Sequence, residues 1–205
     1  MRFPDFYSDI QSIRLIDPLA ETLGSLEGGE IEFSFSDAVK FAGHGCPTVA
    51  GAYLMTYHAL RALYPDSPPV RGNINVYLSS PKFQATTGVI ANVVSAIVGA
   101  GDEGGFKGLG GKFSRCHSIF FEGHFDHALK LERKDNKASL FVDYDPSVVP
   151  AHPMIGDLLG KILELKASEE DKILFKSLWN QRLKNILIDE FNNPQLIKLT
   201  LVTNT

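Results

Sequence analysis

A histidine and a cysteine stand one residue apart in the segment Gly43-His44-Gly45-Cys46-Pro47. In so tight a turn both side chains can face a single ion or substrate. Neutral imidazole and thiolate are the borderline-soft ligands that zinc and other divalent transition metals prefer. The segment therefore predicts a metal site with His44 and Cys46 as ligands.

The position of Cys46 also favours reactivity. Pro47 suits the first position of a helix, where no amide hydrogen is needed, so Cys46 falls at or beside the N-cap. The positive end of the helix dipole favours a thiolate there. Cys46 is thus a candidate catalytic nucleophile as well as a candidate metal ligand, and the residue types leave both roles open. A buried thiol beside a loop histidine is the purely structural alternative.

A third metal ligand has to come from elsewhere in the chain. The clustered candidates are Cys116, His117, His124 and His127. We expect a strand over residues 112–121, on which Cys116 and His117 point to opposite faces, so that only one of them reaches the site. We favour His117. The other two histidines, His124 and His127, are typical of a solvated hairpin turn.

The elements that must position these residues follow from hydrophobic periodicity and from turn residues. The expected helices cover residues 37–41, 47–64, 86–98, 154–165 and 168–190. The expected strands cover residues 73–79, 112–121, 128–133, 139–144 and 195–202. The helix over 47–64 is apolar on nearly every face, which is typical of a helix surrounded by other elements.

Together these elements predict an α+β fold. We expect an antiparallel or mixed sheet packed with helices, with the Gly-His-x-Cys-Pro turn at the N-terminus of a buried core helix. Residues 1–35 are expected to form an N-terminal arm. Residues 36–205 are expected to form the α+β core domain, with C-terminal helices and a closing strand.

Glycines are dense between residues 99 and 111. Residues 99–104 fit the spacing Gly-x-Gly-x-x-Gly, but they follow a helix and not a strand, which argues against a dinucleotide fold. Residues 108–113 do not satisfy a phosphate loop. Lys112 could neutralise an anionic ligand near this loop, although a lysine that opens a strand is more often only solvated.

The run from Phe41 to Tyr53 resembles the Gly-His-x-Cys-Pro signature and following helix of the E-subunit family of molybdenum formylmethanofuran dehydrogenase. Weaker similarity of pattern extends the resemblance over about residues 37–133. The resemblance implies an α+β core that tends to pair into homodimers, with His44 and Cys46 at a bound metal, commonly zinc. The chain lacks C-terminal Cys-x-x-Cys pairs, so it would be a core-only version without a zinc finger.

Composition narrows the remaining function classes. The chain has 205 residues, a formal charge of -4 and no dense basic stretch, which argues against a nucleic-acid partner. Its longest apolar stretch, over residues 49–64, is shorter than the roughly 20 residues that a bilayer requires. With two cysteines and no secretory signal at its start, the chain is expected to be a cytoplasmic protein with no membrane partner.

Two hypotheses of function remain open. The first is a metal-binding protein, with Zn²⁺ or another divalent transition metal, a homodimer, and an unidentified small-molecule ligand. The second is a metal-free scaffold or protein-interaction module that keeps only the fold. The physical reason for expecting a homodimer is an almost wholly apolar helix that has only one small sheet to cover it.

Overall fold

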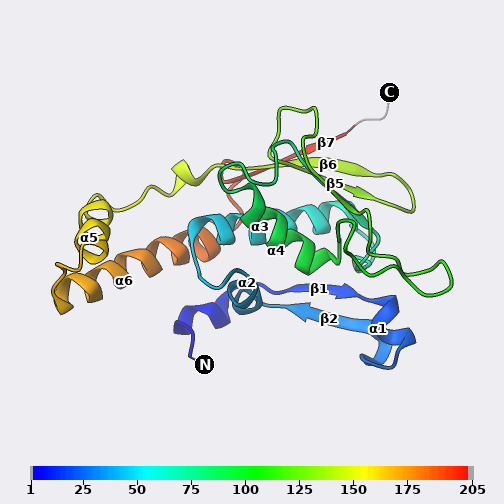
Figure 1. Ribbon diagram of the computed structural model, residues 1–205, viewed down its shortest axis with the longest axis horizontal. Coiled ribbons are helices and arrows are strands. Elements are labelled where there is room, and N and C mark those ends of the chain that lie inside the picture. Colours follow the sequence, from blue (N-terminus) through cyan, green and yellow to red (C-terminus); the bar gives the residue numbers. More distant parts are fainter. Residues whose placement is uncertain (1, 203–205) are drawn as a thin grey trace.

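The computed structural model describes residues 2–202, and it has an α+β architecture with two sheets (Figure 1). The predicted α+β class is therefore confirmed. The helices are α1 (Pro18–Thr22), α2 (Phe35–Ala42), α3 (Pro47–Leu63), α4 (Thr87–Val98), α5 (Met154–Leu163) and α6 (Glu169–Lys184). The strands are β1 (Ile13–Ile16), β2 (Glu30–Phe33), β3 (Ile74–Leu78), β4 (Ile119–Phe120), β5 (Leu129–Arg133), β6 (Ser139–Tyr144) and β7 (Ile197–Leu201).

The larger sheet has the strand order β4-β3-β5-β6-β7. Only the β3–β4 pair is parallel, so the sheet is mixed. Its register aligns Val76 with Leu131, Leu131 with Leu140, and Val142 with Leu199. Because side chains alternate along a strand, this register places one apolar row on the face that meets the helices.

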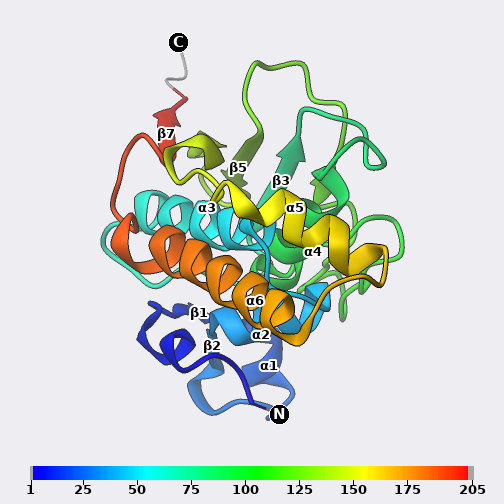
Figure 2. The ribbon, with the colours of Figure 1, turned by 90° about the vertical axis from the view of Figure 1, so that its left-hand side faces the viewer.

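Helix α3 forms the centre of the molecule. It lies between the larger sheet and the small β1–β2 sheet (Figures 1 and 2), and most of its residues are buried. The Tyr53 hydroxyl ties it to the small sheet by donating to the Gln11 carbonyl at 2.8 Å and to the Phe33 carbonyl at 2.9 Å. A single chain therefore buries α3 without a partner. The apolar character of this helix is then no longer a reason to expect a homodimer.

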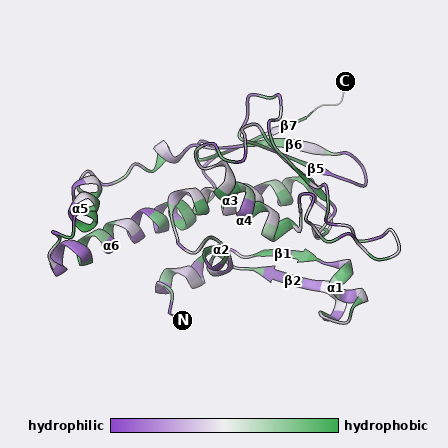
Figure 3. Ribbon diagram, in the orientation of Figure 1, coloured by the Kyte–Doolittle hydropathy of each residue, from purple (hydrophilic) through white to green (hydrophobic). Residues whose placement is uncertain are grey.

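In the small sheet, β1 contributes buried side chains to the core, and β2 lies mainly toward solvent. In β1, Ile13 and Leu15 are buried, whereas most of β2 faces outward. Figure 3 shows the same contrast, with β1 coloured hydrophobic and β2 hydrophilic. Residues 5–33 are thus fixed to the body of the protein by the buried side of β1.

Helices α5 and α6 project away from the sheets as a hairpin (Figure 1). A capping box starts α6: Ser168 accepts from the Asp171 amide, and Asp171 accepts from the Ser168 amide. The apolar side chains at the tip are exposed, with Leu163 at 74% and Leu165 at 94% of full exposure. Among residues 2–202, no helix combines the length and the apolar character needed to cross a membrane.

The strand expected over residues 112–121 is largely wrong, because only Ile119–Phe120 forms a strand. The chain before it is a loop in which Phe113 has a φ of 62° and His117 a φ of 48°. Such left-handed backbone breaks the alternation of side chains that a strand would impose. The argument that Cys116 and His117 face opposite sides of a sheet therefore does not apply.

Candidate functional site

The turn that carries His44 and Cys46 joins α2 to α3. Gly43 ends α2 in the left-handed conformation, with a φ of 79°, and its amide donates to the Val39 carbonyl at 2.8 Å. Cys46 is the extended N-cap of α3, and Pro47 is the first helical residue. The Cys46 side chain makes no capping hydrogen bond. Its sulfur therefore caps no amide of α3, and Cys46 is partly buried against the core at the positive end of this helix.

His44 is exposed, but its ring is held by the backbone. Its Nδ1 lies 3.0 Å from the Ala42 carbonyl oxygen. Since a carbonyl only accepts hydrogen bonds, this contact places a hydrogen on Nδ1, and the neutral ring then has its lone pair on Nε2. Metal-bound histidines commonly show this arrangement, with one nitrogen on the metal and the other donating to a carbonyl or carboxylate.

Two aromatic side chains from distant elements hold Gly45 in place. The Trp179 indole nitrogen, on α6, donates to the Gly45 carbonyl at 2.9 Å. A Cβ at position 45 would lie 2.6 Å from the Tyr7 hydroxyl oxygen, so a larger residue there would have to displace the Tyr7 side chain. The turn is therefore fixed from the N-terminal segment on one side and from α6 on the other.

Tyr144, at the end of β6, brings a third aromatic ring to the site. Its hydroxyl is buried and has no hydrogen-bond partner among the described residues. Burial raises the pKa of Tyr144 to about 12, with a smaller lowering by the Arg182 charge and a smaller raising by Cys46. The Tyr144 ring lies against the backbone of α3 at Gly51, where any Cβ would overlap it. The Tyr144 hydroxyl is therefore a buried, unpartnered donor next to α3.

The structure does not bring the predicted third ligand to this turn. His117 is exposed, and its amide donates to the Asp102 carbonyl at 3.1 Å. The Cys116 thiol donates to the Gly105 carbonyl at 2.6 Å. Within residues 2–202, no three His, Cys, Asp or Glu side chains are grouped closely enough to hold a metal ion. The structure thus does not place His117 in one group with His44 and Cys46.

The two histidines assigned to a solvated hairpin turn differ from each other. His124 is exposed, as expected. For His127 the prediction is wrong. Its Nδ1 lies 2.6 Å from the Asp143 carboxylate, and its ring stacks on the Phe141 ring with the two centroids 4.4 Å apart. His127 thereby belongs to the outer face of the large sheet, the face opposite the one that packs on α3.

A scan against models of known protein families and a search of curated proteins give no match for this chain. The candidate site therefore depends on its own geometry. The turn offers a histidine and a cysteine, the ligand types that a soft divalent cation prefers, and a buried, unpartnered phenol lies against α3. Sequence reasoning found the first two because they are neighbours in the chain. It missed Tyr7, Tyr144 and Trp179, for which no local motif exists.

Proposed function

We propose that this chain is a metal-binding protein whose ligands are His44 Nε2 and Cys46 Sγ, with zinc as the first candidate ion. The observation that carries the proposal is the contact between His44 Nδ1 and the Ala42 carbonyl, because it presents Nε2 as a ligand atom. The uncapped Cys46 thiol and the buried, unpartnered Tyr144 hydroxyl support it. The resemblance to the E-subunit family of formylmethanofuran dehydrogenase points in the same direction.

Two protein ligands leave further positions of a tetrahedral ion for water, a small-molecule ligand or a second copy of the chain. A divalent ion with such open positions supplies Lewis acidity to a bound oxygen or nitrogen atom. The residues of this chain would orient that ligand: His44 is fixed through Ala42, and Tyr144 offers an O–H donor from the buried side. Cys46 is a ligand in this proposal, and a role as nucleophile would require the metal to be absent.

Cobalt substitution tests this proposal directly. Co²⁺ bound through a thiolate gives an intense sulfur-to-metal absorption band, so we expect that band in the wild-type protein and its loss in Cys46→Ser. Cys116→Ser is the matched control and should keep it, because the Cys116 thiol is engaged with Gly105. A cobalt spectrum without sulfur ligation, or one unchanged in Cys46→Ser, would reject the proposal.

The second candidate function is a protein-interaction module, and the α5–α6 hairpin favours it. Leu163, Leu165 and Ile173 are at least two-thirds exposed on this projecting element, at 74%, 94% and 67%. In a two-fold dimer the same surface is used by both copies, so a homodimer would bury these side chains pairwise. Light scattering distinguishes the possibilities: a species of 22.5 kDa at micromolar concentration would exclude the homodimer.

A further inference from the structure

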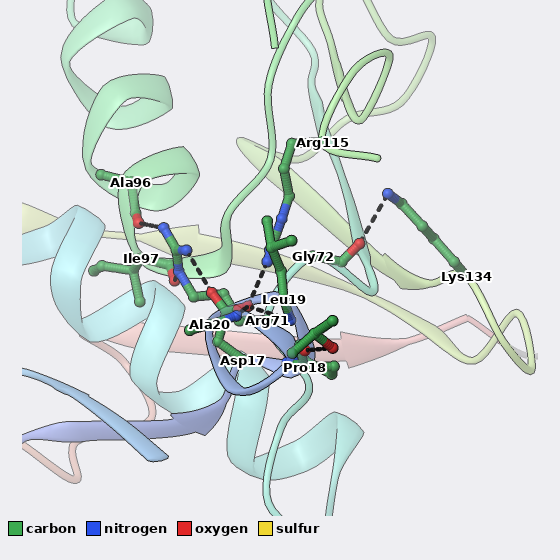
Figure 4. A network of polar contacts seen from close by, with 11 residues as sticks. Asp17, Pro18, Leu19, Ala20, Arg71, Gly72, Ala96, Ile97, Arg115 and Lys134 are labelled. Carbon is green, nitrogen blue, oxygen red and sulfur yellow. Dashed lines mark hydrogen bonds and ion pairs between the residues drawn. The ribbon is translucent and has the colours of Figure 1, made fainter. Parts of the chain in front are cut away.

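A second polar centre lies around Asp17, where β1 meets α1 (Figure 4). Asp17 is 3% exposed and accepts from two guanidinium groups, Arg71 Nη1 at 2.8 Å and Arg115 Nη2 at 2.7 Å. Two largely buried cations therefore share one carboxylate. Such a cluster is costly to bury unless every donor finds an acceptor.

The donors of Arg71 do find acceptors. Its Nε donates to the Ile97 carbonyl at 3.0 Å, and its Nη2 donates to the Ala96 carbonyl at 2.8 Å. Both carbonyls belong to the last turn of α4, the negative end of that helix dipole. Arg71 is thus a structural residue that closes α4 against Asp17.

Arg115 is different, because its guanidinium makes a hydrogen bond through Nη2 alone among the described residues. Its side chain is 10% exposed, and its buried Nη1 has no hydrogen-bond partner among the described residues. The guanidinium lies against the backbone of Gly72 and Gly99, where a Cβ would overlap it. The two glycines therefore leave room for the Arg115 guanidinium. Its charge is only partly neutralised, because Arg115 shares the Asp17 carboxylate with Arg71. No acceptor among the described residues therefore neutralises this part of the Arg115 charge.

A cavity of about 370 Å³ adjoins this cluster, and its lining includes Arg71, Asn73, Phe113, Ser114, Arg115 and Lys134. Lys134 Nζ donates to the Gly72 carbonyl at 2.9 Å and to the Ser118 hydroxyl at 2.7 Å, which leaves one of its three hydrogens free. Burial, together with the charges of Arg115 and Lys137, lowers the pKa of Lys134. No carboxylate is paired with Lys134 among the described residues.

We propose that this cavity binds a dianionic oxyanion group of the phosphate-ester class. Three cations, Arg71, Arg115 and Lys134, and one carboxylate, Asp17, leave a net charge of two positive units (3 − 1 = 2). A phosphate monoester carries about −1.5 to −2 charges at pH 7 and three acceptor oxygens. A planar carboxylate offers half that charge. Lys112, the cation that the sequence suggested for an anion near this loop, is exposed and is not in the lining.

The cavity is larger than a phosphate group, and Phe113 provides an apolar wall. Its volume lies within the range of about 300–1,000 Å³ that is typical of small-molecule sites. Ser114 belongs to the lining and is exposed; its oxygen accepts from the Cys116 amide at 3.3 Å, so its O–H can donate to a ligand. The occupant would therefore be a small phosphorylated molecule.

Calorimetric titration with inorganic phosphate, against chloride at equal ionic strength, tests the proposal in the full chain. We expect phosphate to bind the wild-type protein and to raise its Tm. Lys134→Met should weaken the phosphate affinity at least about tenfold, since a charge-assisted hydrogen bond is lost. Lys137→Met is the matched control, because Lys137 is 64% exposed outside the cavity, and it should bind as the wild type does.

Ser114→Glu keeps the test decisive if Lys134→Met does not fold. Ser114 is exposed, so this variant should fold, and its carboxylate should abolish phosphate binding by occupying the cavity. Absence of phosphate binding beyond that of chloride would overturn the proposal. Unchanged phosphate binding in both Lys134→Met and Ser114→Glu would also overturn it. Binding of succinate in place of phosphate would reject the phosphate-ester class in favour of a dicarboxylate.

Discussion

The two cysteines of the chain differ in the partners of their thiols. The Cys116 thiol donates to the Gly105 carbonyl at 2.6 Å, whereas Cys46 stands at a helix N-terminus without a capping bond. We expect iodoacetamide to alkylate Cys46 first in chelated, native protein, and Cys116 mainly after unfolding. Peptide mapping by mass spectrometry over a time course measures the order. Faster labelling of Cys116 would show that the Cys46 sulfur is not open at the turn.

Two tyrosines provide a matched test of buried hydroxyl groups. The Tyr53 hydroxyl donates to two carbonyls, while the Tyr144 hydroxyl has no partner among the described residues. Tyr53→Phe should therefore lower the free energy of unfolding by about 1–3 kcal/mol, because two buried acceptors lose their donor. Tyr144→Phe should leave the metal-free stability unchanged or slightly higher.

Zinc affinity distinguishes a role of the Tyr144 hydroxyl in metal binding from a role of Tyr144 in packing. If its hydroxyl serves the His44–Cys46 site, Tyr144→Phe binds zinc more weakly than the wild-type protein while its metal-free urea unfolding stays the same. Equal zinc affinity would remove Tyr144 from the site. A large loss of metal-free stability would instead mean that the hydroxyl has a structural partner.

At the scale of elements, alanine substitutions at two helical glycines should change the stability of the protein in opposite directions. In α3, the Tyr144 ring occupies the space beside Gly51, so Gly51→Ala must displace that ring. We expect a destabilisation of about 1–3 kcal/mol from overpacking. In α5, nothing lies within 4 Å of a Cβ at Gly156, so Gly156→Ala should stabilise the protein by about 0.5–1 kcal/mol through helix propensity. Urea denaturation of both variants checks the pair, and a shared sign would contradict this packing.

Helix ends with local signals were predictable from the sequence. The Ser168–Asp171 capping box and Pro47 at the first position of α3 mark where helices begin, and the structure has them there. Helix α2 begins at Phe35, earlier than the expected residue 37, because Ser34 forms a capping box with Asp37 that the sequence analysis overlooked. α6 ends at Lys184, and residues 185–189 continue it as a π-helix.

Elements governed by long-range contacts were not predictable in this way. Residues 112–118 were expected to form part of a strand, but Arg115 pairs with Asp17, 98 residues earlier in the chain. That ion pair helps to hold the segment in a loop, and no pattern within the segment itself predicts the pair. The candidate site shows the same limit, since Trp179 reaches Gly45 from 134 residues away. A motif identifies neighbours such as His44 and Cys46, and the fold alone adds the rest.

For the whole molecule, the buried Asp17 cluster predicts how stability depends on pH. Burial raises the pKa of Asp17, but the hydrogen bonds from Arg71 and Ala20 and the charge of Arg115 outweigh it, so the folded pKa lies below its ordinary value. The unfolded pKa is about 3.9. The stabilisation is therefore fully present above that value, and it is lost as the pH falls through the lower folded pKa.

Asp17→Asn should accordingly lower the free energy of unfolding at pH 7 by about 3–5 kcal/mol, because it leaves buried arginines unpaired. Its deficit relative to wild type should shrink as the pH falls below about 4. Urea unfolding at pH 7, 5 and 3 measures this trend. Asp66→Asn is the control, since Asp66 is exposed and has no ion pair among the described residues. A deficit that does not change with pH would show that Asp17 contributes through packing and not through its charge.

The metal content of the purified protein tests the central claim most directly. Elemental analysis under metal-replete, reducing conditions should find one zinc, or one competing divalent transition ion, per chain of 22.5 kDa. His44→Ala and Cys46→Ser should each lose most of that metal, whereas Cys116→Ser and His117→Ala should keep it. A stoichiometric ion in the wild-type protein that disappears only in the first two variants is the result we predict. Wild-type protein without a stoichiometric ion, or Cys46→Ser that keeps its full metal content, would contradict a metal site at the His44–Cys46 turn.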